Sequence, residues 1–252
     1  MGSLEGRVAL VTGVSRRQGI GYATAGRLAA LGADLFVQHH VPHDALQPWG
    51  ADSIDDVIAG IGGRVRHLGL DLTEPDAPDQ LVAAAVEAYG RVDVLVCNHA
   101  LSGSDGPLGK LDAAMLDRHY AVNTRSSILL MQAFARQHDG ARAGRVVFMT
   151  SGQNLGPMPN EVAYAASKGA LIGIMSTLSH HLIRQGITIN AVNPGPTDTG
   201  YANEETREWV RERMPLGRWG EPDDAARLVS WLCTDDAGWI TGQVINSEGG
   251  FR

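Results

Sequence analysis

The chain has 252 residues, of which 44% are hydrophobic, and a formal net charge of −7. This length and apolar content suffice for one sizeable core. The negative charge and the lack of a Lys/Arg-rich run exclude a nucleic-acid partner, because phosphate backbones require clustered positive charge. No apolar run approaches the roughly 18 residues of a membrane span, and the start "MGSLEGR" lacks a signal-peptide core. We therefore expect a cytoplasmic protein with no membrane partner.

Seven short apolar runs recur along the chain, and segments with helical periodicity separate most of them. This alternation is typical of βαβ crossovers and a parallel sheet. It predicts the α/β class, with a single doubly wound domain over residues 1–252, a seven-stranded parallel sheet and helices on both faces. The expected strands are 8–12, 35–38, 64–68, 92–97, 145–149, 188–192 and 243–247, and the clearest helices are 24–31, 79–89, 111–137 and 163–184.

Two polar stretches interrupt this rhythm. Residues 39–52, "HHVPHDALQPWGAD", are too long for an ordinary connection after a strand and predict an ordered loop or short insertion at the ligand edge of the sheet. Residues 195–222 contain two tryptophans and predict a lid over a pocket.

Metal binding is not expected. Cys97 and Cys233 form neither a CxxC motif nor a disulfide framework, and the nine histidines lack ligand spacing.

The first expected strand leads directly into a glycine-spaced loop. In "VTGVSRRQGIG" the glycines Gly13, Gly19 and Gly21 precede a helix of small residues. Backbone N–H groups at such a helix N-terminus can hold a phosphate. Glycines alone also serve plain tight turns, but the order of strand, loop and helix favours a dinucleotide site.

Arg16 and Arg17 lie inside this loop, and the next strand ends in "LFVQHH" without a carboxylate. An Asp or Glu at that end would accept a hydrogen bond from the adenosine ribose 2′-hydroxyl. Its absence, together with two guanidinium groups suited to a phosphate, predicts NADP(H) in preference to NAD(H). In the alternative, the arginines point to solvent while Gln38 and His39 bind the 2′-hydroxyl.

Tyr164 and Lys168 are spaced i, i+4 on an expected helix, so both lie on one face. An ammonium beside a phenol favours the phenolate, which predicts a lowered pKa for Tyr164 and a part in proton transfer. Ser151 follows an expected strand and could share a substrate oxygen with Tyr164. Taken alone, Ser151 is equally consistent with a loop serine in an ST-turn.

In this context the whole chain resembles the short-chain dehydrogenase/reductase family, in particular its 3-oxoacyl reductase-like members. The motifs that carry the resemblance follow one another in the family's order: "TGVSRRQGIG", "DLT", "CNHA", "AVNT", "YAASK", "NPGPTDT" and the C-terminal "GRWGEP" region. The resemblance implies a Rossmann domain, hydride transfer between a nicotinamide and a carbonyl or alcohol carbon, and a homo-oligomer, either a tetramer or a dimer.

The resemblance also assigns the site residues. The catalytic tetrad falls on Asn123, Ser151, Tyr164 and Lys168, where Asn123 would anchor a water chain and Lys168 would hold the nicotinamide ribose. The implied cofactor-binding residues are Gly13, Ser15, Arg16, Arg17, Gly19, Ile20, Gly21, His39, Asp71, Leu72, Asn98, Tyr164, Lys168, Pro194, Gly195, Thr197 and Thr199. The substrate pocket is expected to include His99, Gln153, Asn154, Leu155, Met158, Tyr201 and Trp209.

The chain departs from the family's pattern in the glycine loop, which is two residues longer, and at His99, which replaces an alanine. His99 is either a packed loop histidine or a residue that shapes the substrate pocket. The predicted function is an NADP(H)-dependent oxidoreductase acting on a carbonyl or secondary alcohol. The alternatives are an NAD(H)-dependent alcohol dehydrogenase, an NADP(H)-sensing protein without turnover, and a lyase or epimerase that recycles its nicotinamide.

Overall fold

A parallel sheet of seven strands forms the centre of the computed structural model, which describes residues 3–47 and 49–251. The strand order β3-β2-β1-β4-β5-β6-β7 places β1 and β4 side by side at the middle of the sheet. The strands are β1 (Val8–Val11), β2 (Asp34–His39), β3 (Val65–Gly69), β4 (Val94–Cys97), β5 (Gly144–Met149), β6 (Ile187–Asn193) and β7 (Val244–Asn246). The predicted α/β class and doubly wound parallel sheet are confirmed.

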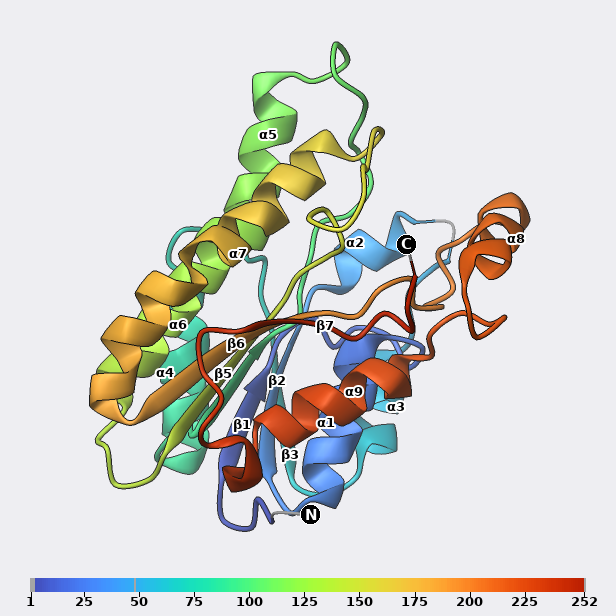
Figure 1. Cartoon of the computed structure of the whole chain (residues 1–252). Coiled ribbons are helices and arrows are strands. Elements are labelled where there is room, and N and C mark those ends of the chain that lie inside the picture. The colour runs from blue at the N-terminus through green and yellow to red at the C-terminus, as the bar shows by residue number, and fades with distance from the viewer. Residues whose placement is uncertain (1–2, 48, 252) are drawn as a thin grey trace.

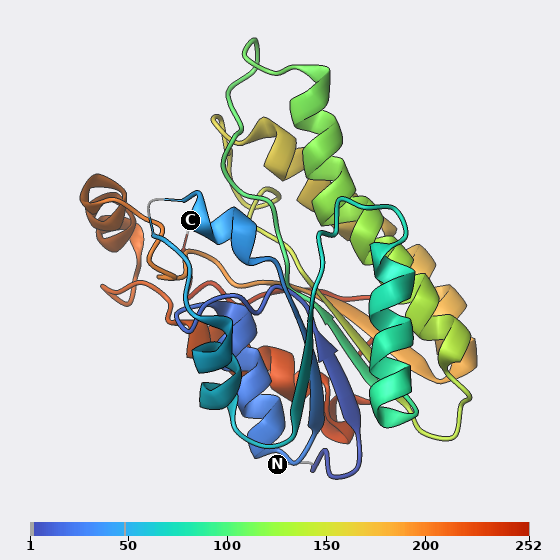
Figure 2. The ribbon, with the colours of Figure 1, turned by 180° about the vertical axis from the view of Figure 1, so that it is seen from behind.

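Helices cover both faces of the sheet (Figures 1 and 2). One face carries α1 (Ile20–Ala30), α3 (Ile54–Ile61) and α9 (Pro222–Leu232). The other carries α4 (Ala77–Tyr89), α6 (Ser126–Gln137) and α7 (Val162–Leu182). Short 3₁₀ turns follow α7 at Ile183–Gln185 and α9 at Asp235–Ala237.

Successive residues of the central strands supply two separate cores. Leu10 and Leu95 point to the core beneath α4, α6 and α7, whereas Val11 and Val96 point to the core beneath α1 and α9. Side chains alternate across a strand, so a strand covered on both faces must be apolar at every position. This explains why the central strands β1 and β4 appear in the sequence as unbroken apolar runs.

The predicted helix over residues 111–137 contains one wide turn. It consists of α5 (Ala113–His119), a π-helical turn at Tyr120–Arg125 and α6. Asn123 lies in the π turn and is completely buried.

The two stretches that interrupt the sequence rhythm each contain a short helix. The insertion forms α2 (Val41–Ala45), and the predicted lid forms α8 (Glu204–Arg213). Both helices lie at the end of the sheet where the strands have their carboxyl ends (Figures 1 and 2).

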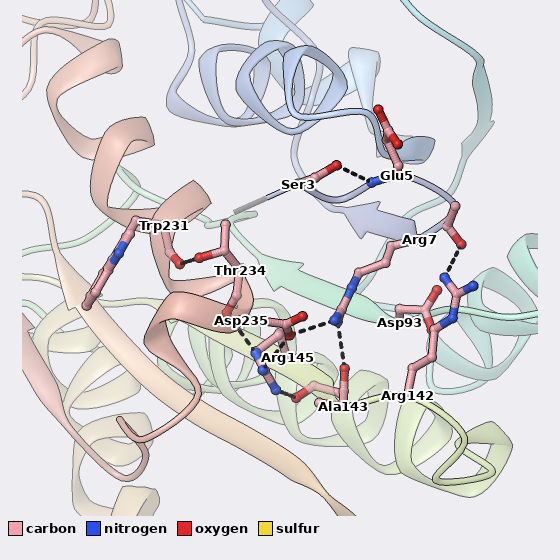
Figure 3. Close-up of polar contacts among 12 residues, drawn as sticks. Ser3, Glu5, Arg7, Asp93, Arg142, Ala143, Arg145, Trp231, Thr234 and Asp235 are labelled. Atoms are coloured by element: carbon pink, nitrogen blue, oxygen red, sulfur yellow. Dashed lines mark hydrogen bonds and ion pairs between the residues drawn. The ribbon is translucent and has the colours of Figure 1, made fainter. Parts of the chain in front are cut away.

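At the opposite end of the sheet, Asp235 joins two buried arginines (Figure 3). Its Oδ1 accepts hydrogen bonds from Arg7 at 2.6 Å and from Arg145 at 3.0 Å. Arg7 also donates to the carbonyl of Ala143, and Arg145 to that of Thr234. Asp235 therefore ties the segment after α9 to the starts of β1 and β5.

Asp235→Ala should reduce the free energy of unfolding by about 1–2 kcal/mol, because it leaves two buried guanidinium groups without their carboxylate. We place the loss below the larger cost of breaking a fully buried pair, since the Asp235 side chain is 64% exposed. Urea denaturation measures the difference. The exposed α4 residue Glu87 provides the control, and Glu87→Ala should change stability by less than about 0.5 kcal/mol. Equal stability of the two variants would contradict this role of Asp235.

Candidate active site

The turn between β1 and α1 packs closely against the end of β4. Gly13 has φ +72°, and a Cβ there would lie 2.7 Å from the His99 Cα. A Cβ on Gly21 would lie 2.6 Å from both the Gly13 carbonyl oxygen and the Asn98 Nδ2. Asn98 Nδ2 donates to the carbonyls of Thr12 and Gly13, at 3.0 and 3.1 Å. Only glycine fits at the two loop positions, as their spacing in the sequence predicts.

A cavity of about 390 Å³ opens beside this turn, at the carboxyl ends of the strands. This is the usual ligand position in doubly wound sheets, and the volume is within the ordinary range of ligand pockets. The predicted cofactor-binding residues that line it are Gly13, Ser15, Arg16, Gly19, Ile20, Asp71, Leu72, Asn98 and Thr199.

Several other residues predicted to bind the cofactor lie outside this lining. The Arg17 side chain is 59% exposed and next to Asp52, and the His39 ring contacts the His67 ring, with their nitrogens 3.2 Å apart. His40, the following residue, lines the cavity instead. Its backbone N–H donates to the Ser15 hydroxyl, which brings the end of β2 to the glycine loop.

Pro194, Gly195 and Thr197 follow the carboxyl end of β6. Gly195 has φ +65° and packs against Glu248, whose Cα would lie 2.6 Å from an added Cβ. The Thr197 hydroxyl donates to the Gly195 carbonyl at 3.2 Å, which holds this turn in shape. The turn leads to Thr199 at the cavity wall.

The insertion after β2 supplies cavity residues that the sequence analysis did not assign. These include Asp44 and Trp49, and Arg118 of α5 also lines the cavity. The position of the insertion at the ligand edge was predicted from its length, but a single sequence gave no signal for which of its side chains would turn inward.

Arg16 is the centre of a polar cluster at this wall. Its Nε lies 3.3 Å from Asp44 Oδ1, its guanidinium lies over the Trp49 ring at 5.3 Å, and it donates to the Thr199 carbonyl at 3.0 Å. The Trp49 indole N–H donates to Asp44 at 3.1 Å. Arg16 thus connects the glycine loop, the insertion and the base of the predicted lid.

The side chain of Gln38, which lines the cavity, makes two hydrogen bonds within the protein. Its Oε1 accepts from the Gly13 N–H at 2.9 Å, and its Nε2 donates to the Leu70 carbonyl at 2.7 Å. Gln38 therefore shapes the glycine loop, and it has little capacity left for the ribose contact that the alternative assignment requires.

Tyr164 and Lys168 lie one turn apart near the start of α7, as predicted. The Lys168 Nζ is 6.0 Å from the centre of the Tyr164 ring and donates to the Met149 carbonyl at 2.8 Å. Burial lowers the pKa of Lys168 to about 8. The ammonium is thus held between the end of β5 and the tyrosine ring.

The predicted lowering of the Tyr164 pKa is wrong for this structure. Burial and the nearby Glu161 carboxylate raise the pKa of the phenol, and its hydrogen bond with Ser151 opposes the shift only in part. The i, i+4 spacing places Lys168 on the same face, but its ammonium is turned toward Met149. Tyr164 therefore keeps its proton at neutral pH.

Asn123 holds the loop after β4 against α7. Its Oδ1 accepts from the Leu101 N–H at 2.7 Å, and its Nδ2 donates to the Leu101 carbonyl and to the Ser167 hydroxyl. Ser167 in turn donates to the Tyr164 carbonyl at 2.8 Å. The four predicted catalytic residues thus lie in one region, which adjoins the cavity at Leu101.

His99 has the geometry of a packed loop histidine. One ring nitrogen is 2.6 Å from the Thr12 hydroxyl, and the other is 2.7 Å from the Ser126 hydroxyl. Burial lowers the pKa of His99 to about 3, so the ring is neutral. His99 is thus packed in the loop and also lines the cavity, so both predicted roles are compatible with its position.

A second hollow lies beside the predicted lid. Tyr201 lines it together with Trp49, Ala202 and Thr206. Trp209 on α8 packs against Phe251 at 6.0 Å between ring centres. The places of Gln153, Asn154, Leu155 and Met158 in a substrate pocket stay predictions.

Within residues 3–47 and 49–251, no helix is long and apolar enough to cross a bilayer, and no cluster of His, Cys, Asp and Glu is suited to a metal ion. Cys97 and Cys233 are free thiols, and burial raises the pKa of each to about 12. Neither is therefore available as a thiolate at neutral pH.

A family model described as enoyl-(acyl carrier protein) reductase matches residues 13–252. The chain is 42% identical to uncharacterized oxidoreductase YjdA of Bacillus subtilis (strain 168), covering 97% of this chain and 96% of that protein. It is 32% identical to the 3-oxoacyl-(acyl-carrier-protein) reductase FabG of Thermotoga maritima, covering 98% of each.

The chain belongs to the short-chain dehydrogenase/reductase family. A solved short-chain dehydrogenase from Burkholderia cenocepacia J2315, in complex with NADP, has 35% identity and a TM-score of 0.85, with 98% of each chain covered. The protein is an oxidoreductase of this family, whose members use NAD(P), and the Rossmann fold expected from the resemblance is confirmed.

Gly21→Ala should weaken NADPH binding at least tenfold, because the new methyl group would push the glycine loop away from Asn98. Fluorescence titration with NADPH measures the dissociation constant. Gly26, in the same helix, has nothing within 4 Å of an added Cβ. Gly26→Ala is the matched control: it should keep the affinity and raise the free energy of unfolding by about 0.5–1 kcal/mol. Unchanged affinity for NADPH in Gly21→Ala would contradict the assignment of the glycine loop to cofactor binding.

Proposed function

We propose that the protein is an NADP(H)-dependent ketone reductase or 3-oxoacyl reductase-like enzyme that interconverts a carbonyl compound and a secondary alcohol. The observation that carries the proposal is the grouping of Ser151, Tyr164 and Lys168 in one region. That region adjoins, at Leu101, a cavity lined in part by glycines. A proton donor and a dinucleotide site beside each other are the two requirements of carbonyl reduction.

The residues of the cavity fit a dinucleotide. Gly13, Gly19 and the start of α1 would hold the pyrophosphate, since no side chain crowds the N-terminus of α1 at Gly19. Asp71 and Leu72 would flank the adenine. Lys168 would hold the nicotinamide ribose, and Pro194, Gly195, Thr197 and Thr199 would support the nicotinamide end.

When bound, the nicotinamide supplies a hydride to the carbonyl carbon of the substrate. Ser151 and Tyr164 would bind the carbonyl oxygen through their hydroxyl groups, and Tyr164 would transfer its phenolic proton to that oxygen as the alcohol forms. The phenol is protonated before the reaction, as a proton donor must be, and its raised pKa makes it a weaker acid than a phenol in water. Solvent then returns one proton to Tyr164, so each turnover consumes one proton.

Asn123 would help return the proton from solvent to Tyr164 by anchoring a water chain. Its two amide hydrogens are already committed to Leu101 and Ser167, so only the remaining acceptor capacity of Oδ1 is open to water. The stronger part of its role is positional, since it fixes Leu101 and, through Ser167, the backbone of Tyr164.

Tyr164→Phe should lower turnover by about two to four orders of magnitude and leave the NADPH dissociation constant within a few fold, because it removes only the proton donor. A screen of ketones, keto esters and acyl thioesters, followed by NADPH depletion, provides the substrate and the assay. Tyr89 is the last residue of α4, and its hydroxyl donates to the Leu35 carbonyl near the start of β2. Tyr89→Phe is therefore the control and should retain activity. Near-normal turnover in Tyr164→Phe would refute the assignment.

Arg16 is the residue best placed to select NADP(H). Its side chain is 16% exposed and faces the cavity near the end of β2, whereas that of Arg17 is farther out. A charge-assisted contact from arginine to a phosphate contributes on the order of 1.5–3 kcal/mol. NAD(H), which lacks the 2′-phosphate, gains nothing from it.

Asp44 supports the second candidate, an NAD(H)-dependent alcohol dehydrogenase. Its carboxylate lines the same wall, neutralises part of the Arg16 charge and could accept a hydrogen bond from a free 2′-hydroxyl. It would also repel a 2′-phosphate. The two candidates therefore differ in which of the paired side chains, Arg16 or Asp44, dominates cofactor choice.

Arg16→Ala should raise the KM for NADPH at least tenfold with little change for NADH, and the loss should shrink as salt is raised. Arg17→Ala, the matched control, should have a smaller effect, and the double variant should resemble Arg16→Ala. Asp44→Asn should lower the KM for NADPH by about fivefold, the equivalent of about 1 kcal/mol. Equal effects on both cofactors, or an unmodified enzyme that prefers NADH, would favour the NAD(H) candidate.

The homo-oligomer stays a prediction of the resemblance. The cytoplasmic location and the assignment of residues 1–252 to one domain stay predictions of the sequence. Leu116 and Tyr120, on the α5 side of the helical segment that contains Asn123, are 41% and 51% exposed. Packing of this segment against a symmetry mate would cover such side chains.

A further inference from the structure

The loop between β4 and α5 carries a carboxylate that is buried against the start of α7. The Asp105 side chain is 3% exposed. Its Oδ1 accepts from the N–H groups of Gly106 at 2.7 Å and Ala163 at 3.0 Å, and its Oδ2 accepts from the Tyr164 N–H at 2.7 Å. The views in Figures 1 and 2 agree that this loop and the start of α7 lie together beyond the end of the sheet.

These contacts give two N–H groups in the first turn of α7 a hydrogen-bond acceptor from a distant part of the chain. The first N–H groups of a helix lack intrahelical partners and are usually capped by the residue just before it. Here that residue is Glu161, whose side chain makes no capping hydrogen bond in the described part of the chain. Asp105 performs the task from 58 residues before Ala163.

The charge of Asp105 is well placed for this contact. Burial alone would raise the pKa of the carboxyl group, but hydrogen bonds from the N–H groups of Tyr164, Ala163 and Gly106 outweigh burial and lower the pKa. The carboxylate is therefore ionised at neutral pH, where it also interacts favourably with the positive end of the helix dipole.

The same loop is held at its other end by Asn123, through both backbone groups of Leu101. Asn123 also reaches the Tyr164 carbonyl through Ser167, so the backbone of Tyr164 is fixed at its carbonyl by one end of the loop and at its N–H by the other. His119 of α5 lies behind the carboxylate, with Nε2 4.0 Å from Asp105 Oδ2.

We propose that Asp105 is a positioning residue for the reaction: by capping α7 at Ala163 and Tyr164, it fixes the phenol of Tyr164 relative to Ser151 and joins the loop after β4 to the catalytic helix. The proposal rests on the proposed role of Tyr164 as proton donor. Asp105 itself does not touch substrate or cofactor in this account. Its effect on the reaction passes through the backbone of Tyr164.

Removal of the carboxylate should therefore impair turnover more than cofactor binding. Asp105→Ala is expected to lower kcat about 10- to 100-fold, since displacement of a reacting group by about 1 Å costs rate on this scale, and to leave the NADPH dissociation constant within about twofold. Asp105→Asn keeps one acceptor oxygen, so its kcat should lie between those of the unmodified enzyme and Asp105→Ala. An unchanged kcat in Asp105→Ala would overturn the proposal.

Asp112 provides a matched control. It is also an aspartate that caps a helix, accepting from the Met115 N–H of α5 at 2.8 Å, but it does not contact α7. Asp112→Ala should leave kcat within about twofold. If both variants lost kcat equally, general loss of stability would explain both effects, and the proposal would be overturned.

A double-mutant cycle with Tyr164→Phe tests whether Asp105 acts through Tyr164. In the Phe background, where the proton donor is already absent, Asp105→Ala should change the single-turnover rate by less than about twofold. The same 10- to 100-fold loss in both backgrounds would contradict a role through Tyr164. If Asp105→Ala fails to fold, Asp105→Asn is used in the same cycle with the same criterion.

Hydrogen exchange separates failure of this proposal from failure of the proposed function. The amides of Ala163 and Tyr164 should exchange at least tenfold faster in Asp105→Ala, whichever reaction the enzyme catalyses. Unchanged exchange overturns the role of Asp105, whereas full activity of Tyr164→Phe overturns the proton donor and leaves the cap intact.

Discussion

The close contact of the β1–α1 turn with Asn98 is the constraint on which the cavity depends. β1 and β4 are neighbours in the sheet, but the chain leaves them in opposite directions, so their carboxyl ends diverge. Asn98 bridges the two strands by donating to the carbonyls of Thr12 and Gly13. The bridge requires Gly13 and Gly21 to lack side chains, and the space that remains beside it is the cavity.

A second set of polar contacts fixes the proposed catalytic residues to this frame. The loop after β4 begins at the Asn98 bridge, is held at Leu101 by Asn123, and contacts the start of α7 through Asp105. One connection therefore joins the glycine turn to the tyrosine helix. The relative position of the proposed hydride donor and proton donor depends on buried hydrogen bonds in a loop, where loss of one partner is costly.

The fold was predictable because its signals are local. Strands buried on both faces must be apolar throughout, and a loop that turns tightly beside another strand must contain glycine, so both features appear directly in the sequence. The same reasoning placed Tyr164 and Lys168 on one face of α7. The spacing did not determine the direction of the ammonium, which depends on the Met149 carbonyl at the end of another strand.

The remaining features depend on contacts between distant segments. The pKa of Tyr164 rises because of burial and Glu161, and neither effect can be estimated before the helix is packed. The pairing of Arg16 with Asp44 depends on how α2 folds back over the glycine loop, and the cap on α7 comes from a loop before α5. A single sequence lists these residues but does not say which of them meet.

Trp49 forms part of the wall of both the cavity beside the glycine loop and the hollow beside Tyr201. Two ligands that contact the same side chain can have linked affinities. If one ligand shifts the Trp49 indole to the position that the other ligand prefers, each ligand increases the affinity for the other by the same factor. Trp49 is therefore the residue through which occupancy of the cavity and occupancy of the hollow would be linked.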